Sequence, residues 1–123
     1  MRHNRHTMAD KEKFLGEFEQ MVLLALLQLG KSAYGASIRQ LLHDEIQRDV
    51  AIGALYSTLE RLEQKGLVTS KFGDATPERG GRPKKFFEVT AKGQSALKRA
   101  RQAMNTMWQG VSIKQRVSQL LAS

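Results

Sequence analysis

The sequence of 123 residues contains no cysteine, one tryptophan and only three histidines. Without cysteine the chain forms no disulfide, no thiolate metal site and no cysteine nucleophile. His3 and His6 lie in a polar N-terminal stretch with no third metal ligand beside them, and we interpret them as solvated. His43 beside Asp44 is interpreted as a surface pair at a helix end, and the sequence has no phosphate-binding glycine loop. We therefore expect no catalytic residue, no metal, no cofactor and no enzyme activity.

Long hydrophobic runs are missing as well. The longest is Met21–Leu29, well short of the roughly 20 residues that a membrane span needs. Residues 1–13 lack the apolar segment of a signal peptide, and we expect them to form a flexible tail. A hydrophobic content of 41% predicts a folded chain. These features indicate no membrane partner and fit a cytoplasmic location.

Positive charge is concentrated in one segment. The formal net charge is +8, yet residues 1–78 are close to neutral, with 10 Lys or Arg against 11 Asp or Glu. Residues 79–101 carry 8 Lys or Arg and a single acidic residue, Glu88. Such clustering indicates a polyanionic partner, most often nucleic acid, although a solvated face that keeps the protein soluble is the alternative.

Three helices are predicted before residue 67, because apolar residues repeat at intervals of three and four. Gly30 and Gly66 are predicted to end the first and third helices, and Ser32 and Asp49 to cap the start of the second and third. The first helix is apolar on more than one side around Leu23–Leu27, which predicts a central position. In the third helix we expect a buried stripe of Ile52, Leu55, Leu59 and Leu62.

The spacing of apolar residues changes from residue 67 onward. Alternation in residues 67–73 and the sequence KKFFEVT predict two strands, joined by a turn that is rich in glycine and contains proline. Thr90 is a candidate N-cap for a last helix. Three helices and a two-stranded hairpin are the outline of a winged helix-turn-helix, so the fold class is mainly α (α+β) with a long C-terminal helix. We expect a DNA-binding domain over residues 14–90 and a dimerisation helix over 91–123.

The third helix would enter the DNA major groove. Its outward face is predicted to carry Gly53, Ala54, Ser57, Glu60, Arg61 and Gln64. Small leading residues allow close approach to DNA, while Ser57 and Arg61 can bind phosphate or bases. Tyr56 lies on the flank and can donate to a phosphate. Glu60 would repel phosphates, and we interpret it, with Gln64, as an ordinary solvated residue.

The hairpin ERGGRPKKFFEVT has the properties of a DNA-binding wing. Its glycines allow the tip to follow a groove, and Arg79, Arg82, Lys84 and Lys85 can contact phosphates. Phe86 or Phe87 is expected to anchor the second strand in the core. The alternative is an exposed loop whose charge only aids solubility.

These motifs together resemble the PadR family of bacterial transcriptional regulators. YGASIRQLL is similar to the family's Tyr-Gly motif, which adds Tyr34 to the candidate DNA-binding residues. GALYSTLERLEQKGLV resembles its recognition helix, and GGRPKKFFEVTAKG its wing. The chain departs from the family pattern at Ser57, where proline is common, and at Phe86 and Phe87, where tyrosines are common. The resemblance covers about residues 15–108 and implies the short subfamily, which dimerises through its last and first helices.

The last helix has an apolar stripe that nothing else in the chain is left to cover. Leu97, Met104, Met107, Trp108 and Val111 therefore predict a homodimer. In the short subfamily, a tryptophan at a similar place stacks on flat aromatic compounds, so the resemblance implies a hydrophobic aromatic effector at Trp108. The alternative is a tryptophan that only fills the interface.

The sequence is consistent with two functions. The first is a dimeric repressor that binds double-stranded DNA at a palindromic operator. The second is a winged-helix protein-interaction module that binds an acidic partner through its basic hairpin. Selective binding to a palindrome would distinguish the first from the second.

Overall fold

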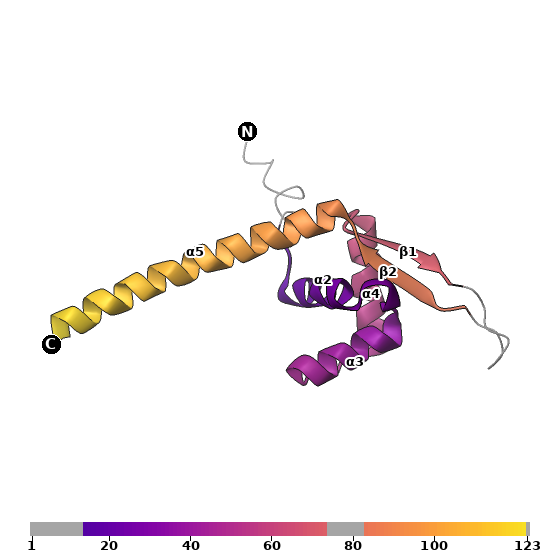
Figure 1. The fold of residues 1–123 in the computed structure, drawn as a ribbon, viewed down its shortest axis with the longest axis horizontal. Helices are drawn as coiled ribbons and strands as arrows, with labels where there is room; N and C mark the ends of the chain where they lie inside the picture. Colours follow the sequence, from indigo (N-terminus) through magenta and orange to yellow (C-terminus); the bar gives the residue numbers. More distant parts are fainter. Residues whose placement is uncertain (1–13, 74–82, 123) are drawn as a thin grey trace.

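The computed structural model of the chain describes residues 14–73 and 83–122. Helix α2 (Glu17–Leu29) is followed by the 3-10 turn η2 (Gly30–Ser32), α3 (Gly35–Ile46) and α4 (Ile52–Gln64). Strands β1 (Val68–Phe72) and β2 (Lys85–Val89) then precede the 32-residue helix α5 (Ala91–Ala122). In Figure 1 the three shorter helices lie together, while the hairpin and α5 extend from them in opposite directions. The winged-helix prediction is confirmed.

The hairpin is antiparallel, with Val68 opposite Val89 and Phe72 opposite Lys85. It is joined to the start of α3, because the Phe87 amide donates to the Ala33 carbonyl at 2.9 Å and Tyr34 forms a bridge with Phe86. Phe87 is buried and confirms the expected anchor of the second strand. The wing is therefore attached to the helix-turn-helix by backbone pairing as well as by a side chain.

The core lies between α2, α3, α4 and the base of the hairpin. Its fully buried large side chains come from all these elements: Val22, Leu23, Leu26, Ile38, Leu55, Leu59, Leu62 and Val68. Gly30 and Gly66 end α2 and α4 at φ of 58° and 78°, as predicted. Thr90 caps α5, since its hydroxyl accepts from the Gly93 amide at 3.0 Å.

Two of the predicted caps are wrong. Ser32 lies in η2 and donates to the Leu29 carbonyl, while Ser37 accepts from the backbone amide of Tyr34, the residue before α3. Asp49 is bound to His43 Nδ1 at 2.7 Å instead of capping α4, so the predicted pairing of His43 with Asp44 is also replaced. Residue type makes Ser32 and Asp49 candidate caps, whereas the turn geometry decides which amide each side chain reaches.

The predicted burial is wrong at Ile52. Ile52 is 46% exposed, because it is the first residue of α4 and the core begins one turn later at Leu55. Helix α2 is central as predicted, since it contacts α3, α4, β2 and α5, but its Leu24 and Leu27 are exposed. They border α5 on the side of α2 that faces away from the core. Periodicity identified these apolar faces but not what covers them.

Candidate nucleic-acid interface

The outward face of α4 is exposed as predicted. Leu55, Thr58, Leu59 and Leu62 are buried, and the side opposite them faces solvent. Gly53 has open space where a side chain would be, with no atom within 4 Å of an added Cβ. No packing contact within the described structure therefore requires glycine at this position. Ala51, the residue before the helix, has no side chain that could cap it.

Tyr56 and Tyr34 pack α4 and the hairpin against the start of α3. The Tyr56 ring is tilted against Phe87 at 6.2 Å, and its hydroxyl lies only 2.5 Å from where a Cβ on Gly35 would be. Tyr34 meets Phe86 edge-on at 5.6 Å. The Tyr-Gly pair of the sequence therefore has a physical reason, since the glycine makes room for the second tyrosine. The sequence showed the motif but not this contact.

Two of the four predicted wing cations lie within the described structure. Lys84 Nζ lies 4.3 Å from the centre of the Tyr34 ring, and Lys85 Nζ lies between the rings of Phe72 and Phe87 at 5.6 and 5.7 Å. Lys85 also borders a hollow of about 180 Å³ with Gly53 and Ser57 of α4. The structure thus brings the wing and the outward face of α4 together. Arg79 and Arg82 lie outside the described residues.

Arg61 is placed differently from the other candidates. Its Nε donates to Glu19 Oε2 at 3.2 Å, and Lys65 Nζ donates to the same oxygen at 3.0 Å. Glu19 Oε1 accepts from the Gly16 amide at 2.9 Å. Glu19, Arg61 and Lys65 form what we name the α2–α4 ion triad. It holds the last turns of α4 against the start of α2, and Arg61 therefore has a partner within the protein.

Neighbouring charges and burial shift the pKa of Glu19 in opposite directions. Burial of its side chain raises the pKa of the carboxyl, but the Gly16 amide and the ammonium and guanidinium groups of Lys65 and Arg61 outweigh that effect and hold the pKa below its usual range. Glu19 is thus charged in the folded protein at neutral pH. Reasoning from sequence missed this residue, although an acidic residue on a predicted core helix was a usable signal.

The predicted dimerisation residues divide into two groups. Leu97 packs against the core, whereas Met104, Met107, Trp108 and Val111 are exposed, and Trp108 is 63% exposed. Between α2 and α5 runs a groove of about 500 Å³, lined by Leu24 and Leu27 on one side and by Leu97 and Met104 on the other. Trp108 lies about one turn farther along α5. The apolar face of α5 is therefore continuous with that of α2.

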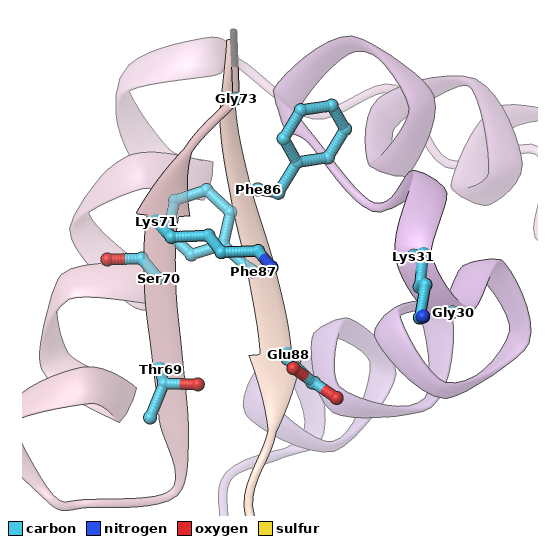
Figure 2. A pocket seen from close by; sticks show the side chains of 9 residues that line it. All are labelled: Gly30, Lys31, Thr69, Ser70, Lys71, Gly73, Phe86, Phe87 and Glu88. Carbon is cyan, nitrogen blue, oxygen red and sulfur yellow. The ribbon is translucent and has the colours of Figure 1, made fainter.

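A second hollow, of about 290 Å³, lies between η2 and the outer face of the hairpin. Figure 2 shows Lys71 and Glu88 on the hairpin and Lys31 on the facing turn, with Phe86 at one end. Within residues 14–73 and 83–122, no group of three or more acidic or histidine side chains is placed to hold a metal ion. Nor is any described helix long and apolar enough to cross a membrane.

Comparison with known proteins gives a consistent result. The sequence model described as the transcriptional regulator PadR-like family matches residues 23–99. No curated protein is significantly similar to the chain. A PadR-like transcription factor from Bacteroides fragilis is 27% identical, with a TM-score of 0.64 over 85% of this chain and 93% of its own. A PadR family regulator from Clostridium difficile is 23% identical, with a TM-score of 0.64 over 79% of this chain and 96% of its own. The winged-helix DNA-binding protein F93 from STIV shares the fold at 16% identity, with a TM-score of 0.60 over 76% and 94% of the two chains.

Proposed function

The chain belongs to the PadR-like family of transcriptional regulators, and on that premise we propose that it is a homodimeric repressor of a palindromic operator. The α4 helix inserts its N-terminal half into the major groove, and the wing contacts the adjacent phosphates. The single observation that carries this proposal is the hollow that Lys85 of the wing shares with Gly53 and Ser57 of α4, although Glu60 and Glu63 also line it. A cationic strand beside a small, exposed helix face suits a negatively charged duplex.

The DNA-contacting residues follow from this arrangement. Gly53 and Ala54 let the helix approach the bases, and Ser57 donates to a base or a phosphate. Tyr56 and Tyr34 position the helix and the wing through their ring contacts with Phe87 and Phe86. Arg61 Nε is held by Glu19, so Arg61 contacts DNA with the terminal nitrogens of its half-exposed guanidinium.

A second copy of the chain covers the apolar face of α5 in this proposal. The face runs from Met104 to Val111 and continues onto Leu24 and Leu27 of α2. Burying several large side chains that are now about half exposed favours association by about 1–2 kcal/mol each, before the entropy of association is subtracted. A two-fold dimer places two α4 helices at half-sites about one helical turn, or ~34 Å, apart.

An aromatic effector is the proposed release signal. Trp108, which lies on the same apolar face, would stack on a flat ligand bound between the two subunits, and the ligand would change the spacing of the two α4 helices. The alternative is a Trp108 that fills the interface and binds no ligand. Repression follows from an operator that overlaps a promoter, where the bound dimer excludes polymerase.

Selection from a random duplex library with the full chain tests the proposed function. We expect enrichment of a palindrome that binds far more tightly than its scrambled version in fluorescence anisotropy at about 0.15 M salt. Gly53→Ala should weaken this binding several-fold without loss of folding, because the added methyl meets only open space in the protein. Gln64→Ala, at the far end of the same outward face, is the matched control. Enrichment of no sequence, with equal and salt-sensitive binding to all duplexes, would favour the protein-interaction module instead.

A further inference from the structure

The side chains at the start of α4 are all apolar. Ala51, Ile52, Gly53 and Ala54 are all exposed, and none has a side chain that can donate or accept a hydrogen bond. Ile52 is the largest of them and is 46% exposed. Polar side chains begin one turn later, at Tyr56 and Ser57.

This end of the helix limits how bases can be recognised. In a docked helix-turn-helix, the N-terminal residues of the recognition helix meet the base edges. Hydrogen-bonding side chains distinguish guanine, adenine and cytosine there, but residues 51–54 offer none. The major groove presents one apolar group, the C5-methyl of thymine, and an aliphatic side chain recognises it by contact. The long cation on the same helix, Arg61, lies more than two turns away and is bound to Glu19.

We propose that Ile52 is a specificity residue that reads the 5-methyl group of a thymine in each half-site. The proposal rests on the proposed function, because it requires α4 to lie in the major groove. Gly53 beside it has open space where a side chain would be, so no side chain at that position stands between α4 and the bases. The operator therefore carries an A·T pair opposite the first turn of each α4.

The magnitude follows from the size of the contact. One buried methyl-sized group changes affinity by about fourfold, and two symmetry-related contacts by about 15-fold. Replacing thymine with deoxyuridine removes only the methyl group and leaves the base pair intact. The substitution thus isolates the contact without altering the protein.

The experiment uses the duplex obtained by selection with the full chain. Each thymine is replaced singly, and then in symmetric pairs, by deoxyuridine, and affinity is measured by anisotropy at about 0.15 M salt. We expect wild type to lose about fourfold at one thymine in each half-site and about 15-fold when both are replaced. Ile52→Ala should bind the thymine and deoxyuridine duplexes equally. Ile46→Ala, which changes an isoleucine that is 41% exposed at the end of α3, should keep the wild-type difference.

The outcomes are distinguishable. A selected palindrome whose affinity is unchanged by every deoxyuridine substitution overturns the role of Ile52 and leaves the proposed function intact. The same holds if Ile52→Ala keeps the full deoxyuridine effect, because another group then reads the methyl. Failure to select any sequence overturns both, and that result is obtained before any substitution is made. The deoxyuridine series needs only wild-type protein, so an unstable variant does not block the test.

Discussion

Removing the charge of Glu19 should destabilise the protein more than removing any exposed acidic charge. Glu19→Gln keeps the shape and an acceptor for the Gly16 amide, but Lys65 then faces a neutral group. The Glu19 side chain is only 9% exposed, and Lys65 Nζ lies 3.0 Å from it. Breaking a buried pair by removing one partner costs about 3–5 kcal/mol. Arg61 is half exposed and regains water, so we expect a loss of about 2–3 kcal/mol in the free energy of unfolding.

The pH dependence gives this prediction a second test. The folded protein holds the pKa of Glu19 below its usual range, while the unfolded chain has the usual value of about 4.3. A lowered pKa contributes stability above the unfolded pKa, and that contribution is lost as pH falls through the folded pKa. The difference in the free energy of unfolding between wild type and Glu19→Gln should therefore be constant above about pH 6 and shrink below about pH 4.

Urea unfolding followed by circular dichroism, at one fixed protein concentration, measures this difference. Fixed concentration matters because a dimer's apparent stability depends on it. Glu17→Gln is the matched control: it lies on the same helix and pairs with Arg48, but its side chain is 75% exposed. We expect it to change stability by less than about 0.5 kcal/mol. If the two variants unfold alike, or if the Glu19→Gln difference widens toward acid pH, the stabilising role given to the α2–α4 ion triad is refuted.

Three further predictions concern the start of α5, the wing and the dimer. Gly93→Ala should lower the free energy of unfolding by about 2 kcal/mol or more, because the added Cβ would collide with the backbone carbonyl of the residue before β1. In the control, Gly110→Ala, the added Cβ meets only open space, so this variant should be at least as stable as wild type. Equal melting temperatures for the two variants would contradict the clash at Gly93. Replacing Lys84 and Lys85 with glutamine should weaken binding to all duplexes. It should also reduce the slope of log affinity against log salt by about one for each phosphate that is no longer neutralised. An unchanged slope would show that these lysines do not contact DNA phosphates. Trp108, the only tryptophan, should shift its fluorescence to shorter wavelength as the protein is concentrated and dimerises; an emission that is independent of concentration, in a protein that sediments as a monomer, would refute the α5 interface.

The helices and the hairpin could be predicted because their signals are local. Gly30 and Gly66 end their helices where the sequence places them, and Thr90 caps α5. These features depend on the backbone within a few residues. Periodicity and turn residues also predicted the order of the elements, and the family motifs agree with it.

What could not be predicted depends on contacts between distant residues. Arg61 was interpreted as a DNA contact because it lies on the outward face of α4, yet its partner, Glu19, is 42 positions away. Ile52 has the correct spacing for burial, but no neighbouring element covers it at the first turn of α4. A pattern in one helix shows which residues share a face and leaves open what lies against it.

Hydroxyl-radical footprinting of the full chain on its selected duplex tests the central claim most directly. We predict two protected windows related by two-fold symmetry and spaced about one helical turn, or a whole multiple of it, apart. Each window should be flanked by backbone protection from the wing. A single window, or uniform weak protection that disappears at about 0.15 M salt, would contradict recognition of DNA by a symmetric pair of α4 helices.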